Sequence, residues 1–170
     1  MGLRRTFDLA TQALQKANVA HALIGGFALA AHGIARATQD IDFLADGSKR
    51  DLIRDSLTKV GFQLYHESAE VLQFQGAGSL DILLANRPLS QKMLKDAQTK
   101  IWNSIYVLRA EDIIGLKIQS YINDKKRAGQ DKVDIQSLIR STPHLDWVRV
   151  LEYAALFDQT TELERLKAEA

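Results

Sequence analysis

Up to residue 109, segments with the hydrophobic pattern of a strand alternate with segments that have the pattern of a helix. After residue 109, every segment has the helical pattern. Residues 3–17 repeat apolar side chains at helical spacing, which predicts a first helix. Short apolar or alternating segments then predict strands separated by turns and helices. The segment 79–85 is apolar on both faces, which is typical of an interior strand. The other predicted strands are residues 21–26, 40–45, 62–66, 71–75 and 104–109.

Residues that are typical of helix ends predict several more helices. A short helix over 27–33 is expected to end at Gly33, and a helix over 48–60 to start with Ser48 as its N-cap. Pro88 is expected to open the next helix, near residues 88 to 98. The later helices are expected over residues 110–125 and 131–141, with one or two more before the end of the chain.

These elements predict an α+β fold. It comprises a small mixed β-sheet of about five strands with flanking helices, followed by a C-terminal helical region. Residues 1–109 would form the α/β core, and residues 110–170 would form a helical region that packs on it.

Composition excludes several classes of protein. Apolar residues make up 46% of the chain and charged residues 25%, which is the balance of a soluble globular protein. The net charge of +1 gives no global basic field for nucleic acid, and the absence of cysteine excludes disulfides and thiolate metal sites. No apolar run reaches about 18 residues, so no contact with a membrane is expected. The first ten residues do not resemble a signal peptide, so we expect a cytoplasmic protein.

Two acids stand one residue apart in the apolar segment DIDFLA. On a helix, residues i and i+2 point about 200° apart and cannot share a ligand. On a strand they lie on one face, about 6.6 Å apart along the chain, so Asp40 and Asp42 can converge on one or two metal ions. Ile41 and Phe43 would then share the opposite face. The alternative is a strand end whose acids reach solvent, and D-x-D alone does not decide between the two.

Two further features accompany this pair. Gly25 and Gly26 lie between a strand and a helix, where they would let the backbone approach a phosphate closely or would only form a tight turn. Asp81 lies inside the apolar segment SLDILL, where it would complete a metal site or would only cap a turn. Oxygen ligands without cysteine favour Mg²⁺ over zinc.

Arg36 and Thr38 precede the pair at alternate positions. They would lie on the same side as Asp40 if the strand already runs there. Arg36 would neutralise phosphate charge, or it would form an ion pair with an acid for structural reasons.

Together, GGFALAAHGIARATQDIDF and the later LDIL resemble the nucleotidyltransferase superfamily, which has the polymerase-β-like fold. That superfamily has Gly-Gly or Gly-Ser on a strand–helix turn, Asp-x-Asp on the next strand and a third Asp on a later strand. The form Arg-x-Thr-x-Asp-Ile-Asp is similar to the AbiEii-type branch of bacterial nucleotidyltransferase-like toxins, and to lincosamide and aminoglycoside nucleotidyltransferases. The matching residues here are Gly25, Gly26, Asp40, Asp42 and Asp81.

The resemblance continues into the helical half of the chain, to about residue 140. There, EDIIGLKIQSYINDKKRAGQDKVDIQSLI is similar to an AbiEii-type segment in which a Lys is followed by Asp-x-x-Asp on the next helix. The matching positions are Lys117, Asp131 and Asp134. The resemblance implies that Lys117 contacts the phosphates of the nucleotide and that Asp134 helps to shape the site. Alternatively, Lys117 is a solvated helix residue and Asp131 a helix N-cap.

The resemblance implies a transferase that uses two Mg²⁺ ions and takes an NTP as the donor substrate. Asp40, Asp42 and Asp81 would hold the metals, and Asp81 would activate a hydroxyl of the acceptor. That acceptor would be tRNA, another RNA, a protein or a small molecule, and the enzyme would be the toxin of a bacterial toxin–antitoxin system with a cognate antitoxin as partner. The alternatives are a non-catalytic nucleotide-binding or antitoxin-like protein, and an antibiotic nucleotidyltransferase.

Overall fold

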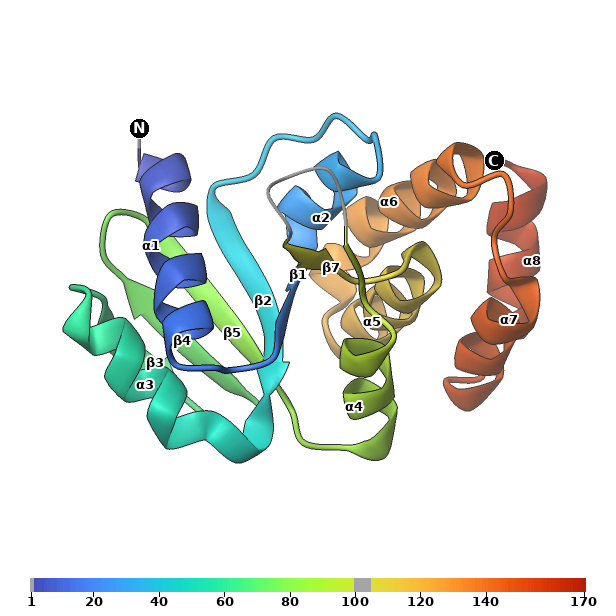
Figure 1. Cartoon of the computed structure of the whole chain (residues 1–170). Helices are drawn as coiled ribbons and strands as arrows, with labels where there is room; N and C mark the ends of the chain where they lie inside the picture. The colour runs from blue at the N-terminus through green and yellow to red at the C-terminus, as the bar shows by residue number, and fades with distance from the viewer. Residues whose placement is uncertain (1, 100–104) are drawn as a thin grey trace. The chain divides into compact units, whose positions relative to one another are not determined.

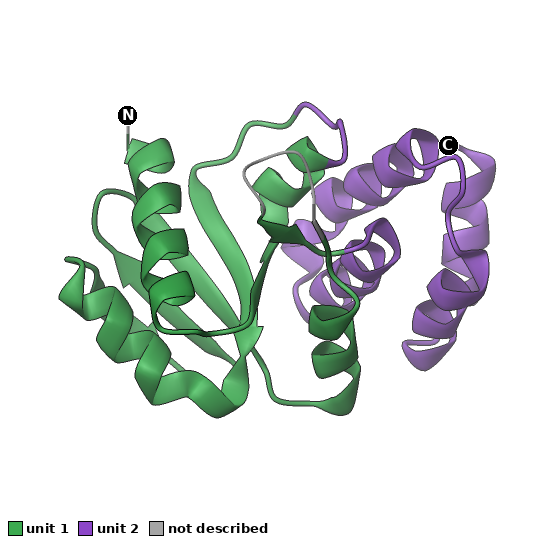
Figure 2. Ribbon diagram, in the orientation of Figure 1, with its two compact units in different colours: residues 1–31, 36–108 green, residues 32–35, 109–170 purple. Residues whose placement is uncertain are grey.

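The computed structural model describes residues 2–99 and 105–170, and the chain forms two compact units (Figures 1 and 2). The first unit contains the β-sheet and helices α1 to α4, and the second contains helices α5 to α8. The first unit comprises Met1–Ala31 and Arg36–Leu108, and the second His32–Ala35 and Arg109–Ala170. None of the described helices combines the length and the apolar character that crossing a membrane requires.

Seven strands within the described residues form one mixed sheet, in the order β3-β4-β5-β2-β1-β7-β6. Strand β2 runs parallel to β5, whereas β1 pairs antiparallel with β2, and β4 antiparallel with β5. The interior position predicted for 79–85 is confirmed, because β5 lies between β4 and β2. The strands are β1 (His21–Ile24), β2 (Asp40–Asp46), β3 (Gln63–Glu67), β4 (Val71–Gln75), β5 (Ser79–Ala85), β6 (Gln98–Thr99) and β7 (Tyr106–Val107).

The described part of the sheet has seven strands, whereas about five were expected from the sequence. Six of them lie at segments that were predicted as strands, and only β6 was not predicted, because its two residues give almost no periodic signal. Strand β7 occupies only part of the predicted strand 104–109, whose first residue, Ser104, lies outside the described residues.

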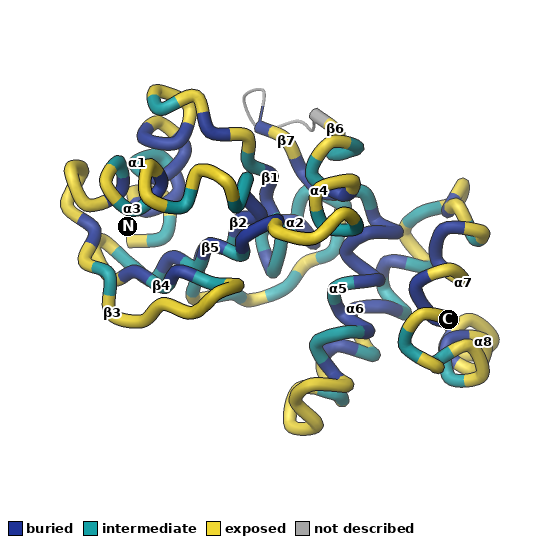
Figure 3. The backbone as a smooth tube through the Cα atoms, turned by 90° about the horizontal axis from the view of Figure 1, so that it is seen from below, coloured by how far each residue is buried: buried dark blue, intermediate teal, exposed yellow. Residues whose placement is uncertain are grey.

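One face of the sheet is apolar. Ile41 and Phe43 on β2 are fully buried on this face, and the ring of Phe7 on α1 (Gly2–Lys16) stacks on Phe43 with 6.2 Å between centroids. Because side chains alternate along a strand, Asp40 and Asp42 point to the opposite face, as the sequence predicts. Figure 3 shows the buried centre of the sheet and the exposed strand β3 at its edge.

The remaining helices of the first unit lie near the predicted positions, with two corrections. Gly25 and Gly26, which were predicted to end a strand, are the first two residues of a helix that ends at Ala31 rather than at Gly33. Ser48 is not the N-cap of a helix over 48–60, because a 3₁₀ turn (Gly47–Lys49) comes first. Asp46 caps that turn by accepting a hydrogen bond from the Ser48 backbone N–H, and the α-helix starts at Arg50. The helices are α2 (Gly25–Ala31), α3 (Arg50–Lys59) and α4 (Pro88–Lys95).

The second unit buries charged residues between its helices. Asp112 is fully buried and accepts hydrogen bonds from the Arg149 guanidinium at 2.6 and 2.8 Å and from the Tyr153 hydroxyl at 2.5 Å. Burial raises the pKa of the Asp112 carboxyl, and the bonds from Arg149 and Tyr153 oppose this rise. The helices are α5 (Ala110–Asn123), α6 (Ala128–Ser141), α7 (Trp147–Leu156) and α8 (Thr160–Ala168).

Candidate active site

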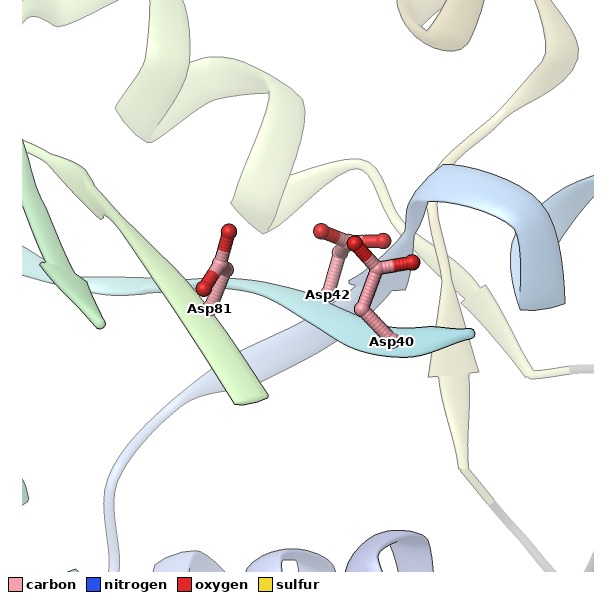
Figure 4. A group of neighbouring side chains, drawn as sticks. All are labelled: Asp40, Asp42 and Asp81. Carbon is pink, nitrogen blue, oxygen red and sulfur yellow. The ribbon is translucent and has the colours of Figure 1, made fainter. Parts of the chain in front are cut away.

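Three carboxylates converge on the polar face of the sheet (Figure 4). Asp40 and Asp42 extend from β2 and Asp81 extends from β5. One oxygen from each side chain lies within 4.8 Å of the others, and all three residues are half-buried. Within residues 2–99 and 105–170, this is the one group of three or more acids or histidines with such spacing.

The strand register explains why these acids meet. Because β2 and β5 run parallel, Asp42 lies directly beside Asp81, and Asp40 lies beside Ser79. Residues paired across neighbouring strands point to the same face, so Asp42 and Asp81, which are 39 positions apart in the sequence, share one site. The acids therefore share a site because of a pairing between strands that the sequence pattern alone does not specify.

The glycine turn lies against the same site. Ile24 at the end of β1 pairs with Asp42, so the chain enters α2 right beside that carboxylate. Gly25 has a φ of +65°, and a Cβ atom there would lie 2.0 Å from Asp42 Oδ2. A Cβ on Gly26 would lie 2.6 Å from the Cβ of Thr38. Both glycines are thus required by close approach, and Gly25 also by its left-handed backbone.

Thr38 and Arg36 lie in the segment before β2, which starts only at Asp40. The hydroxyl of Thr38 lies 3.1 Å from Asp40 Oδ1 and 3.2 Å from the Asp40 carbonyl oxygen, either of which can accept its proton. Arg36 is half-buried in this segment. Thr38 therefore contacts one of the three carboxylates, and the nucleotide-binding roles of Arg36 and Thr38 remain predictions.

Gln73 is a neighbour of the site that the sequence analysis missed. It lies on β4 directly opposite Asp81, and its Nε2 donates a hydrogen bond to Asp81 Oδ2 at 2.9 Å. The three-residue connection Gly76–Gly78 between β4 and β5 sets this register, because Gln75 and Ser79 form the last pair before it. Short hairpin loops fix strand register, so this turn was the signal available in the sequence.

Lys117 and Asp134 belong to the second unit, on α5 and α6. The ammonium of Lys117 lies 2.8 Å from Asp131 Oδ1 and 2.6 Å from Asp134 Oδ2, and each of these side chains is at most 8% exposed. Lys117 is therefore not a solvated helix residue. Asp131 is not an N-cap either, because it is the fourth residue of α6. The phosphate contact of Lys117 and the role of Asp134 in the site stay predictions.

Comparisons with known proteins bear on the fold. No family model matches the chain, and no curated protein matches its sequence. The crystal structure of ANT(2″)-Ia in complex with adenylyl-2″-tobramycin is similar with a TM-score of 0.72 at 17% identity, covering 92% of this chain and 97% of that one. A nucleotidyltransferase-like antigenic protein from Paracoccidioides brasiliensis gives a TM-score of 0.59 at 20% identity, with 95% and 91% covered. The lincomycin-bound lincosamide antibiotic adenylyltransferase LnuA gives 0.54 at 18% identity, with 78% and 93% covered.

These similarities confirm the predicted fold class, an α+β nucleotidyltransferase fold. Each of the three neighbours is matched over most of its own length. Activity and substrates are properties of a site and do not follow from a fold.

Proposed function

We propose that the protein is a divalent-cation-dependent nucleotidyltransferase that moves a nucleoside monophosphate from an NTP to a hydroxyl acceptor. The observation that carries this proposal is the convergence of Asp40, Asp42 and Asp81 beside a glycine turn. Three carboxylates within 4.8 Å repel one another, and a bound cation would reverse the sign of that interaction. The arrangement supports a function in which a cation is bound.

The donor atoms fit Mg²⁺. All three ligands are carboxylate oxygens, which hard cations prefer, and the group contains neither histidine nor cysteine. Asp40 and Asp42 would hold one or two ions from β2, and Asp81 would contribute from β5. When bound, the ions would neutralise charge on the triphosphate of the donor.

The residues of the chain would then promote the transfer itself. Asp81 would accept the proton of the acceptor hydroxyl. The acceptor oxygen would form a bond to the α-phosphorus of the NTP. The bond from that phosphorus to the oxygen bridging to the β-phosphate would break, and pyrophosphate would leave with the electron pair. Most of the rate would come from holding the two substrates in line.

The nucleotide would lie over the turn at Gly25 and Gly26, where the absence of side chains lets the backbone lie close against Asp42 and Thr38. Arg36 and Thr38 would contact the nucleotide from the segment before β2. In the second unit, Lys117 would contact the phosphates and Asp134 would help to shape the site, as the AbiEii-type resemblance implies. In this chain both residues also form a buried ion pair.

Small hydroxylated molecules are the acceptor class with the most support. Two structural neighbours are described with an adenylylated aminoglycoside and with lincomycin, and the chain matches both over at least 93% of their length. RNA or protein as acceptor, with a role as the toxin of a toxin–antitoxin pair, is the second class. The similarity of the Arg-x-Thr-x-Asp-Ile-Asp motif of this chain to the AbiEii-type branch supports this second class.

A transfer assay tests the proposal. The protein would be incubated with each α-labelled NTP and Mg²⁺, in parallel with aminoglycosides, lincosamides, tRNA and cell extract. We expect label on one acceptor class, loss of transfer with EDTA, and loss by at least about 10³-fold in Asp42→Asn. Near-wild-type transfer by the variant would refute the proposed site. NTP binding without transfer to any acceptor would indicate the non-catalytic alternative.

A further inference from the structure

Two rows of side chains cross the polar face of the sheet, and each includes a glutamine on β4. The two glutamines differ in the hydrogen bonds that they form. The first row runs from Asp42 on β2 through Asp81 on β5 to Gln73 on β4, whose partner on β3 is His66. The second row runs from Asp40 through Ser79 to Gln75, whose partner on β3 is Gln63. Each row therefore includes a glutamine of β4 that forms a hydrogen bond across to β5.

The two glutamines use opposite ends of their amide groups. Gln75 accepts a hydrogen bond from the Ser79 hydroxyl, 3.1 Å from its Oε1. Gln73 instead donates from Nε2 to Asp81 Oδ2 at 2.9 Å. The first is a contact between two neutral side chains at the exposed edge of the row. The second is half-buried and restrains a carboxylate of the candidate metal site.

We propose that Gln73 is a positioning residue that holds the Asp81 carboxylate in the orientation in which it binds a divalent cation together with Asp42. This inference rests on the proposed function of the three carboxylates. A second donor on a metal-binding carboxylate fixes the rotation of that carboxylate, and removing such a partner typically weakens metal binding about 10- to 100-fold.

The chemistry of glutamine suits this role. Its amide is neutral, so it restrains Asp81 without placing a positive charge beside the cation, as a lysine or arginine would. The strand register supplies the precision, because Gln73 and Asp81 are direct partners in an antiparallel pair. A rigid strand holds such a donor more accurately than a loop would.

Binding of Mn²⁺ by the full chain, followed by the loss of the free-ion EPR signal, tests the inference without any need for turnover. The variants are Gln73→Met, which keeps the length of the side chain but removes the donor, and the matched control Gln75→Met. A third variant, Gln73→Asn, keeps an amide that is one methylene too short to reach Asp81. Urea unfolding of each variant shows whether it is folded.

We expect wild type to bind Mn²⁺, Asp42→Asn to lose binding, and both Gln73 variants to bind about 10-fold more weakly. Gln75→Met should bind like wild type while showing a loss of urea resistance similar to that of Gln73→Met. Equal Mn²⁺ affinity in a folded Gln73 variant and in Gln75→Met would overturn the positioning role and leave the proposed function intact. Failure of the wild type to bind Mn²⁺ would overturn both.

Discussion

Buried acids of the second unit lie against cations, whereas the acids that converge in the first unit lie against one another. Asp112 is fully buried and receives two hydrogen bonds from the guanidinium of Arg149. Asp131 and Asp134 share the ammonium of Lys117 at 2.8 and 2.6 Å. In each case the cation comes from another helix of the unit, so the ion pair ties two helices together.

In the first unit, Asp40, Asp42 and Asp81 bring their oxygens within 4.8 Å of one another. Thr38 is placed to donate to Asp40, and Gln73 donates to Asp81; both are neutral donors that orient a carboxylate without cancelling its charge. Ion pairing within the second unit ties its helices together, whereas the convergence in the first unit brings together the oxygen ligands that a bound cation requires. We take this difference to separate acids that hold helices together from acids that can bind a cation.

The largest effect is expected at Lys117. Replacing Lys117 by methionine would leave Asp131 and Asp134 buried without their cation, so the free energy of unfolding should fall by about 3–5 kcal/mol. Urea unfolding measures this loss. The control is Lys126→Met, since Lys126 is exposed and should tolerate the change. Similar stability of the two variants would show that the buried network contributes nothing.

Gly25→Ala should cause the next largest loss in the free energy of unfolding. Alanine there would adopt a strained left-handed backbone and would clash with Asp42 Oδ2. The matched control is Gly61→Ala, where φ is +98° and nothing lies within 4 Å of the added Cβ. Both variants should lose about 1–2 kcal/mol from the left-handed backbone. Gly25→Ala should lose more and should also lose Mn²⁺ binding. If both retain equal Mn²⁺ affinity, the turn does not support the acids.

Neutralising one acid should lower the stability of the protein in the second unit but not in the first. Without divalent cations, Asp42→Asn relieves repulsion between carboxylates and should leave the free energy of unfolding unchanged or raise it by about 1 kcal/mol. Asp131→Asn weakens the pairing with Lys117 and should lower it by about 1–2 kcal/mol. Urea unfolding in EDTA compares them, and a similar loss in both variants would remove the distinction.

The smallest effect is expected at Glu162 on α8. Hydrogen bonds from Arg165 and Lys132 lower the pKa of its carboxyl from 4.5 to about 2. Because the folded pKa is the lower one, ionised Glu162 stabilises the fold above about pH 4.5, and this stabilisation is lost as the pH falls towards 2. Glu162→Gln should therefore cost under about 1 kcal/mol at neutral pH, because the pair is near the surface. The difference from wild type should shrink by about pH 3 in urea unfolding; a constant difference would argue against this ion pair.

The sequence pattern predicted most of what builds the site. The alternation around Ile41 and Phe43 correctly put Asp40 and Asp42 on one face, and the glycine pair correctly marked the turn after β1. These predictions succeeded because strand and turn geometry are local. Gln73 was missed because its role depends on pairing between strands.

The second unit shows the other limit of prediction from sequence. The helical period placed Lys117 and Asp131 on neighbouring helices, yet the choice between solvent, capping and a buried pair depended on how those helices pack. An isolated Lys or Asp in a helical pattern carries no sign of its burial. Its partner becomes visible only when both helices are in place.

The most direct test of the account is urea unfolding of wild type and Asp42→Asn over a range of Mg²⁺ concentrations. We predict that in EDTA the variant is at least as stable as wild type, because the acids in wild type repel one another. Added Mg²⁺ should then stabilise wild type, by about 2.7 kcal/mol at a concentration 100-fold above its Kd, and leave the variant unchanged. If Mg²⁺ stabilises neither protein, or stabilises both equally, Asp40, Asp42 and Asp81 do not form a cation site.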